Sequence, residues 1–159
     1  MRHISLPVLA DVGLEVGERE MIEVDPIGAN QYRLLHSPAF VDGLATGDVI
    51  ELDQSLTSGF RVISRARNIV VIVAFETEQD KSLTPVEDLQ RKVRDLGGVV
   101  DGGPTRVLVL TLPLRAGFER IEPLLADFIQ RVPGSTWWYG NVYEAGDPSR
   151  PLDWWKQDL

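Results

Sequence analysis

The sequence predicts an α+β fold built from two unlike parts, followed by a short tail. Residues 1–67 consist of short segments rich in β-branched and aromatic residues, which are separated by turn residues and show no helical period. Residues 68–145 alternate apolar, strand-like runs with two amphipathic helical patterns. Residues 146–159 form a tail that carries two adjacent tryptophans. These three observations define the predicted organisation.

The first part is predicted to be a small antiparallel, barrel-like subdomain. Apolar residues alternate with others in the N-terminal "MRHISLPVLADVG", which is typical of a strand. Three further strands are expected: "QYRLLHS" after the turn "DPIGAN", "DVIELD" after "GLATG", and "FRVISRAR" after "LTSG". Each is bounded by Gly, Pro, Asn or Ser, as strands joined by turns are.

The second part opens with a strand and a helix. "NIVVIVAFE" is apolar on both faces, so we expect a central strand. In "TPVEDLQRKVRDLGG", Thr84 is predicted to cap the helix, with Pro85 at the first helical position and Glu87 completing a capping box. Gly97 suits the left-handed stop. The predicted apolar stripe comprises Val86, Leu89, Val93 and Leu96.

Two strands, a second helix and a last strand follow. "GVVDGGPTRVLVLTLP" predicts two strands joined by a turn at residues 101–104. "GFERIEPLLADFIQRVPG" predicts a helix that either begins near Glu122 or kinks, because Pro123 disrupts a helix interior. "STWWYGNVYE" predicts the last strand. The apolar side of the second helix is predicted to comprise Phe118, Ile121, Leu125, Phe128 and Val132.

The order β-α-β-β-α-β is that of a ferredoxin-like arrangement, which places both helices on one face of the sheet. The other face then needs a cover, for which residues 1–67 are the natural candidate. In the last strand, alternation predicts that Trp137, Tyr139 and Tyr143 point one way. Trp138 and Val142 are predicted to point the other way.

The composition limits the classes of function that the chain can have. The net charge is −8, with 16 basic residues against 24 acidic ones, which argues against nucleic acid as a partner and favours a basic protein. There are no cysteines, so there is neither a disulfide framework nor a thiolate metal site. The apolar runs are too short to span a membrane, and the N-terminus lacks the pattern of a signal peptide. We expect a cytoplasmic protein.

Catalytic motifs are absent from the sequence. His3 and His36 lack the spacing of metal ligands, and His36 and Ser37, as neighbours on a strand, are expected to face opposite ways. There is no Gly-x-Ser-x-Gly elbow and no phosphate-binding loop. We therefore predict a protein that is not an enzyme and binds no metal or cofactor. Catalysis by carboxylates such as Asp48 and Glu51 is the alternative kept open.

One stretch resembles a known family. In "NQYRLLHSPAFVDGLATGDVIELD" a Tyr-Arg-apolar strand precedes a Pro-Phe-like step and then Gly-x-x-x-Gly-Asp-x-apolar-x-apolar. This pattern, with "LGGVVDGG" and "VLTLP" later, resembles the bacterial domain-of-unknown-function family 4265 over residues 20 to 145. The resemblance implies a two-part α+β architecture and no catalytic residues. The residues that carry it are Tyr32, Arg33, Leu34, Pro38, Phe40, Gly43, Gly47, Asp48, Val49 and Ile50.

The tail is expected to be docked rather than free. Burying one Trp removes about 150–250 Å² from water, worth roughly 4–6 kcal/mol at about 25 cal/mol per Å². That gain exceeds the side-chain entropy lost on ordering. Trp154 or Trp155 is therefore predicted to pack, either within the chain or as an anchor on a partner.

The size, acidity and lack of catalytic motifs are similar to those of immunity proteins, which neutralise bacterial toxins of type VI or contact-dependent systems. The leading hypothesis is such an inhibitor, which occludes the active site of a basic toxin, most concretely a nuclease. The alternative is a small-molecule-sensing regulatory domain without catalysis. The residues predicted to bind the partner are Glu15, Glu18, Glu20, Glu76, Glu78, Asp80, Asp147, Asp153, Trp154, Trp155 and Asp158.

Overall fold

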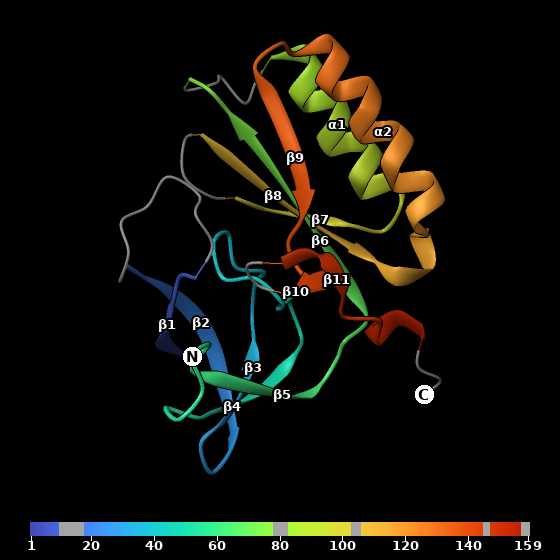
Figure 1. Ribbon diagram of the computed structural model, residues 1–159. Helices are drawn as coiled ribbons and strands as arrows, with labels where there is room; N and C mark the ends of the chain where they lie inside the picture. The colour runs from blue at the N-terminus through green and yellow to red at the C-terminus, as the bar shows by residue number, and fades with distance from the viewer. Residues whose placement is uncertain (10–17, 78–82, 103–105, 145–146, 157–159) are drawn as a thin grey trace.

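The computed structural model of the chain describes residues 1–9, 18–77, 83–102, 106–144 and 147–156. In these residues the fold is α+β, with antiparallel sheets and two helices, as predicted (Figure 1). The helices lie together on one side of one sheet, and the N-terminal strands lie on its other side. The sheet that the helices cover therefore has an apolar layer on each of its two faces.

The first sheet contains five strands that neighbour one another in chain order: β1 (Arg2–Pro7), β2 (Arg19–Gly28), β3 (Gln31–Leu34), β4 (Val49–Leu52) and β5 (Phe60–Ser64). All of its pairs are antiparallel. The predicted strands of this region are confirmed, whereas β2 is not predicted by its acidic sequence. Its signal is the alternation of exposed residues with Ile22 and Val24, both of which are fully buried.

The second sheet has the spatial order β7-β8-β6-β9 with every pair antiparallel. Its strands are β6 (Asn68–Phe75), β7 (Val99–Gly102), β8 (Val107–Pro113) and β9 (Ser135–Tyr139). Helix α1 (Thr84–Asp95) connects β6 to β7, and the short 3-10 helix η1 (Leu114–Ala116) and helix α2 (Phe118–Arg131) connect β8 to β9. β6 is central and buried on both faces, as its apolar run predicts.

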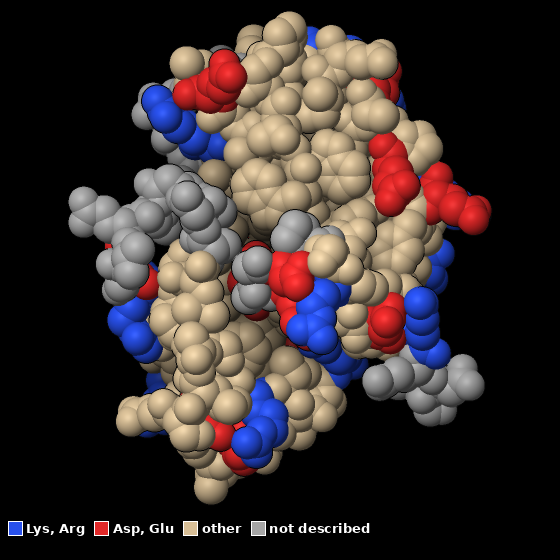
Figure 2. Space-filling view, viewed as in Figure 1, with Lys and Arg blue, Asp and Glu red and all other residues tan. Residues whose placement is uncertain are grey.

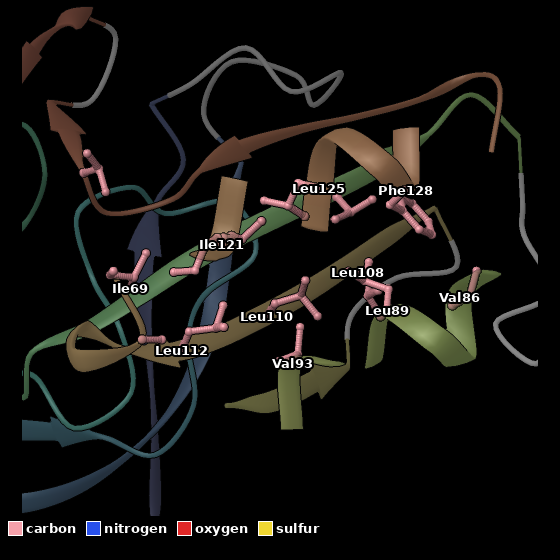
Figure 3. Close-up of a cluster of buried hydrophobic side chains, with 14 of the residues drawn as sticks. Ile69, Val86, Leu89, Val93, Leu108, Leu110, Leu112, Ile121, Leu125 and Phe128 are labelled. Carbon is pink, nitrogen blue, oxygen red and sulfur yellow. The ribbon is translucent and has the colours of Figure 1, made fainter. Parts of the chain in front are cut away.

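The main core lies between this sheet and the two helices. Figure 3 shows the helix side chains, such as Leu89 and Leu125, directed at those of β6 and β8. The predicted stripes are confirmed at their centres, because Val86, Leu89 and Val93 of α1 and Ile121, Leu125 and Phe128 of α2 are buried. Residues three and four apart share one helix face, which is why the stripes could be predicted.

The predicted capping box of α1 is wrong. Leu83 is the capping residue, with an extended backbone (φ −60°, ψ 144°), and no side chain caps the helix. Thr84 already belongs to the first helical turn, where its hydroxyl cannot take the capping position. The predicted stop is confirmed: Gly97 has φ +86°, and the N–H groups of Gly97 and Gly98 donate to Arg94 O and Val93 O.

Helix α2 begins at Phe118, so a start near Glu122 is wrong. Gly117 precedes it with φ +81°, and the Gly117 carbonyl accepts from the N–H groups of Arg120 and Ile121. The first turn therefore forms upstream of Pro123, which lies inside the helix. The predicted turn at residues 101–104 lies partly outside the described residues.

The predicted last strand is broken after Tyr139. β10 (Tyr143–Glu144) pairs instead with β11 (Asp147–Pro151) in a separate two-stranded sheet, which precedes the 3-10 helix η2 (Trp154–Lys156). At the break, the Asn141 side chain takes the place of strand backbone: its Oδ1 accepts from Val70 N–H at 2.9 Å and its Nδ2 donates to Asn68 O at 2.7 Å. The main chain is thereby released from β6 and turns away.

This break corrects two predicted side-chain directions. Val142, expected on the side of Trp138, belongs to the core under the helices. Tyr143, expected beside Trp137 and Tyr139, is 38% exposed. Trp137 and Tyr139 do pack on the helix side, and Trp138 packs on the opposite side.

The outer face of the second sheet packs on the loop that joins β3 to β4. Ser37 Oγ lies 2.6 Å from Thr111 Oγ1, and Gly43 N–H donates to Gly140 O at 2.8 Å. These polar contacts accompany a further apolar cluster, and Phe40 of the loop also packs against the core of the first sheet, so the loop connects the two sheets. The cluster joins Ala39, Phe40 and Ala45 of the loop to Val70, Ile72, Val107, Val109 and Trp138.

Candidate functional site

The tail tryptophans pack within the chain. Trp154 is 5% exposed, and its Nε1–H donates to Asn141 O at 2.8 Å. The Arg65 guanidinium carbon lies 5.6 Å from the centre of the Trp154 ring. Docking inside the chain, the first of the two predicted alternatives, therefore accounts for Trp154.

Trp155 extends a series of edge-to-face aromatic contacts. It lies 5.5 Å from Phe118, which lies 5.4 Å from Tyr139, which in turn lies 5.0 Å from Trp137, measured between ring centres. β9 lies at the edge of its sheet, and Figure 2 shows a surface without Lys, Arg, Asp or Glu over this region. The aromatic residues thus tie the tail to α2 and β9.

Glu20, one of the predicted partner-binding acids, is engaged inside the chain. Its carboxylate accepts hydrogen bonds from the backbone N–H groups of Ala39 at 2.8 Å, Phe40 at 2.9 Å and Val41 at 3.0 Å. Three such donors satisfy most of a carboxylate's capacity. Glu20 therefore fixes the β3–β4 loop rather than offering a free charge.

The other predicted acids come from separate elements. Glu76 is exposed after β6, Asp147 accepts from Ser149 N–H at 3.0 Å, and Asp153 lies 3.1 Å from Lys156 Nζ. Glu18 is exposed beside β2. The structure brings Glu18 and Glu20 together but does not gather the others with them in one pocket. Glu15, Glu78, Asp80 and Asp158 lie outside the described residues.

An open depression of about 570 Å³ lies where β2 meets the end of β7. Four carboxyl groups line it, from Glu18, Glu20, Glu23 and Asp101; we call it the acidic depression. Arg19 lines it as well, but its guanidinium is engaged with Ser5 at 2.8–2.9 Å. The depression is therefore predominantly negative.

The floor of the acidic depression is a polar network. Asp101 accepts a short hydrogen bond from the Thr111 hydroxyl, and Thr111 in turn contacts Ser37. Burial raises the pKa of Asp101, an effect partly offset by Thr111 and His36. His36 Nε2 accepts from Glu23 N–H at 3.2 Å, so His36 and Ser37 serve structural contacts here.

Sequence reasoning missed Glu23 and Asp101. Glu23 has a usable signal, because its spacing of two from Met21 and of four from Arg19 puts it on the same, more exposed side of β2. From the sequence, Asp101 is predicted to be a turn residue. Its position beside Thr111 results from the pairing of β7 with β8.

A second hollow, of about 470 Å³, lies between the five-stranded sheet and the β10–β11 segment; we call it the Asp42 cavity. Burial and the nearby carboxylate of Glu20 raise the pKa of Asp42 to about 6. The sequence gives no signal for this cavity, because its walls come from three segments that lie far apart in the chain. They comprise Pro7, Leu9, Val41, Asp42, Gly43, Leu56, Thr57, Ser58, Phe60, Val62, Arg65, Tyr143, Glu144 and Leu152.

Asp48, named above as a candidate catalytic acid, is buried and acts as an acceptor for the backbone. Its carboxylate accepts from Ala45 N–H at 3.0 Å and from Ala66 N–H at 2.9 Å. Arg65 Nη1 lies 3.3 Å from the same carboxylate. Asp48 therefore holds the ends of the β3–β4 and β5–β6 connections together.

Two negative findings concern the described residues alone. They contain no group of three or more His, Cys, Asp or Glu side chains placed to hold a metal ion. Neither α1 nor α2 combines the length and apolarity that crossing a membrane requires, and the described part of the chain has no other helix that does.

Comparison with known proteins places the chain by family and by fold. The family described as Domain of unknown function (DUF4265) matches residues 20–136. The comparison with curated proteins gave no match. Among solved structures, a hypothetical protein from Neisseria gonorrhoeae is similar, with a TM-score of 0.65 and 12% sequence identity over 88% of this chain and 96% of that chain. Similarity at this identity shows a shared fold alone.

Proposed function

The chain belongs to the DUF4265 family of domains of unknown function, and from this premise we propose that it is a non-catalytic binding protein for a basic protein partner. The most concrete form of the proposal is an immunity protein, which resides in the cytoplasm and occludes the active site of a toxin delivered by a type VI or contact-dependent system. The observation that carries the proposal is the acidic depression.

The acidic depression supports a basic partner by shape and charge. Glu18 is exposed, and Glu23, whose carboxylate lies 3.8 Å from His3 Nε2, keeps 44% of its side chain exposed, so both are accessible to an incoming Lys or Arg. The hollow accommodates a projecting side chain, and the exposed Met21 beside it adds an apolar contact. A net charge of −8 also accelerates encounter with a basic surface.

Charge reversal tests the proposed surface. The partner in the test is the protein encoded next to this gene, co-produced with the chain and titrated by calorimetry. We expect Glu18→Lys with Glu23→Lys to weaken binding about 100-fold, because two attractive pairs become repulsive. A matched control, Asp95→Lys with Glu119→Lys on the helices, makes the same change of net charge and leaves affinity within about threefold.

Two results would contradict the proposal. If the neighbouring protein neither binds nor harms cells that lack this chain, the immunity role is wrong. If both double variants weaken binding equally, the partner responds to net charge and the acidic depression is not the contact surface.

We also infer the finer architecture expected from the sequence. The order β7-β8-β6-β9, with α1 and α2 as connections, supports a ferredoxin-like subdomain over residues 68–145. The meander β1–β5 supports a separate antiparallel subdomain over residues 1–67. On this division, the acidic depression lies where the two subdomains meet, and residues 146–159 are a tail.

A further inference from the structure

The Asp42 cavity has the size and the walls of a small-molecule site. Its volume of about 470 Å³ falls within the range of roughly 300–1,000 Å³ that is common for ligand pockets. Val41, Phe60, Val62 and Leu152 give it apolar walls. Apolar walls with few polar groups are the usual composition of such pockets.

Among the described residues, each charged side chain that lines the cavity has an oppositely charged partner, except Asp42. Arg65 faces the cavity, but its Nη1 is 2.5 Å from Gly43 O and 3.3 Å from Asp48, which neutralises it. Glu144 lies 3.8 Å from Arg150 at the rim. Asp42 makes no hydrogen bond or ion pair with the described residues. The unbalanced group of the cavity is therefore a carboxyl.

A carboxylate in this position gains from a positively charged ligand. Desolvation penalises its ionised form, and the nearby Glu20 adds repulsion, which together raise the pKa of Asp42. A cation next to Asp42 offsets both effects. Phe60 and Tyr143 also line the cavity, and aromatic faces attract cations.

We propose that the Asp42 cavity binds a small organic ammonium compound. Its ammonium group pairs with the Asp42 carboxylate, and its apolar body lies along Phe60 and Val62. An anionic ligand is disfavoured because it meets Asp42 and Glu144. A neutral ligand leaves the Asp42 carboxylate without a partner. This site is distinct from the acidic depression and does not depend on the proposed protein partner.

A matched series of probes tests the charge. Titrations of 2-phenylethylamine, 2-phenylethanol and phenylacetate at pH 7.5 are followed by the backbone NMR signals of Asp42, Phe60 and Val62. The three probes share a phenyl group and differ in charge. We expect the amine to bind at least about tenfold more tightly than the other two, equivalent to about 1.4 kcal/mol. Equal binding of the three, or no shift of these signals with the amine, would overturn the proposal.

Variants test the location. Asp42→Asn keeps the side-chain shape and is expected to weaken amine binding about tenfold. Asp95→Asn, at an exposed acid of α1, is the matched control and is expected to leave affinity unchanged. Val62→Phe fills the cavity while retaining Asp42, and we expect it to abolish binding. Unchanged affinity in both cavity variants would show that the amine binds elsewhere and would refute the site.

Discussion

Acidic residues that look equivalent in the sequence have unlike roles in the fold. Glu20 and Asp48 each accept two or more backbone N–H groups and hold loops in place. Asp42 makes no such contacts among the described residues. Glu18 and Glu23 keep much of their surface exposed. Residues with the same formal charge therefore differ in whether a partner can contact them directly.

The first prediction concerns Asp42→Asn and pH. The folded state raises the pKa of Asp42 to about 6, so between about pH 4 and 6 the folded chain holds more protons than the unfolded chain. The contribution of Asp42 to the stability of the fold is thus fully present below pH 4, where its carboxyl group is protonated. This contribution is lost as the pH rises through 6. Because Asn carries no charge, we expect the free energy of unfolding of the variant to be roughly 2–3 kcal/mol higher than that of the native chain above pH 7.

The measurement is urea unfolding of both proteins at pH 4 and pH 7.5. The repulsion between Glu20 and Asp42 is part of the expected difference, because Glu20 contributes to the raised pKa of Asp42 and the variant has no charge at position 42. Arg65 and Glu144, which also line the cavity, are present in both proteins. A variant that is no more stable than the native chain at pH 7.5 would show that Asp42 is solvated or paired.

Among the elements, those with a complete local period were predictable. The stripes of α1 and α2 and the apolar run of β6 follow from spacing alone. The end of β9 was not predictable, because it depends on Asn141 bonding to Val70, 71 residues earlier in the chain. β2 was missed because its exposed acids obscure Ile22 and Val24.

The second prediction concerns the docking of η2. Trp154→Ala removes a buried ring and its hydrogen bond to Asn141 O, so we expect a loss of about 3–5 kcal/mol of unfolding free energy. Trp155→Ala, at the half-buried neighbour, serves as the control and should cost less than about 2 kcal/mol. Urea unfolding monitored by circular dichroism gives both values. Equal costs would mean that η2 is held by Trp155 and its contact with Phe118.

At the scale of the whole molecule, the two sheets are connected through the β3–β4 loop, which packs against the second sheet and whose Phe40 also packs against the core of the first. Phe40 and Ala45 of the β3–β4 loop pack against Val70 and Trp138, and the Ser37–Thr111 contact adjoins them. The sequence indicated that the outer face of the second sheet needs a cover. It could not indicate the cavity, whose walls join Pro7 to Leu152, because no local pattern encodes that proximity.

The third prediction is cooperative unfolding. All four tryptophans follow Thr136, so their fluorescence reports on the second sheet and the tail. NMR signals of Ile22 and Val24 report on the first sheet. Because the interface is shared, we expect both probes to give one urea midpoint. A lower midpoint for the first sheet would mean that it unfolds on its own and that the shared cluster contributes little.

The Asp42 cavity is lined by both Pro7 and Leu152, and synthesis proceeds from one to the other. A nascent chain that has already made the strands of the five-stranded and four-stranded sheets still lacks Leu152. The complete lining therefore exists only after residue 152 has been added, so a compound that needs Leu152 for binding is captured after both of these sheets have been synthesised.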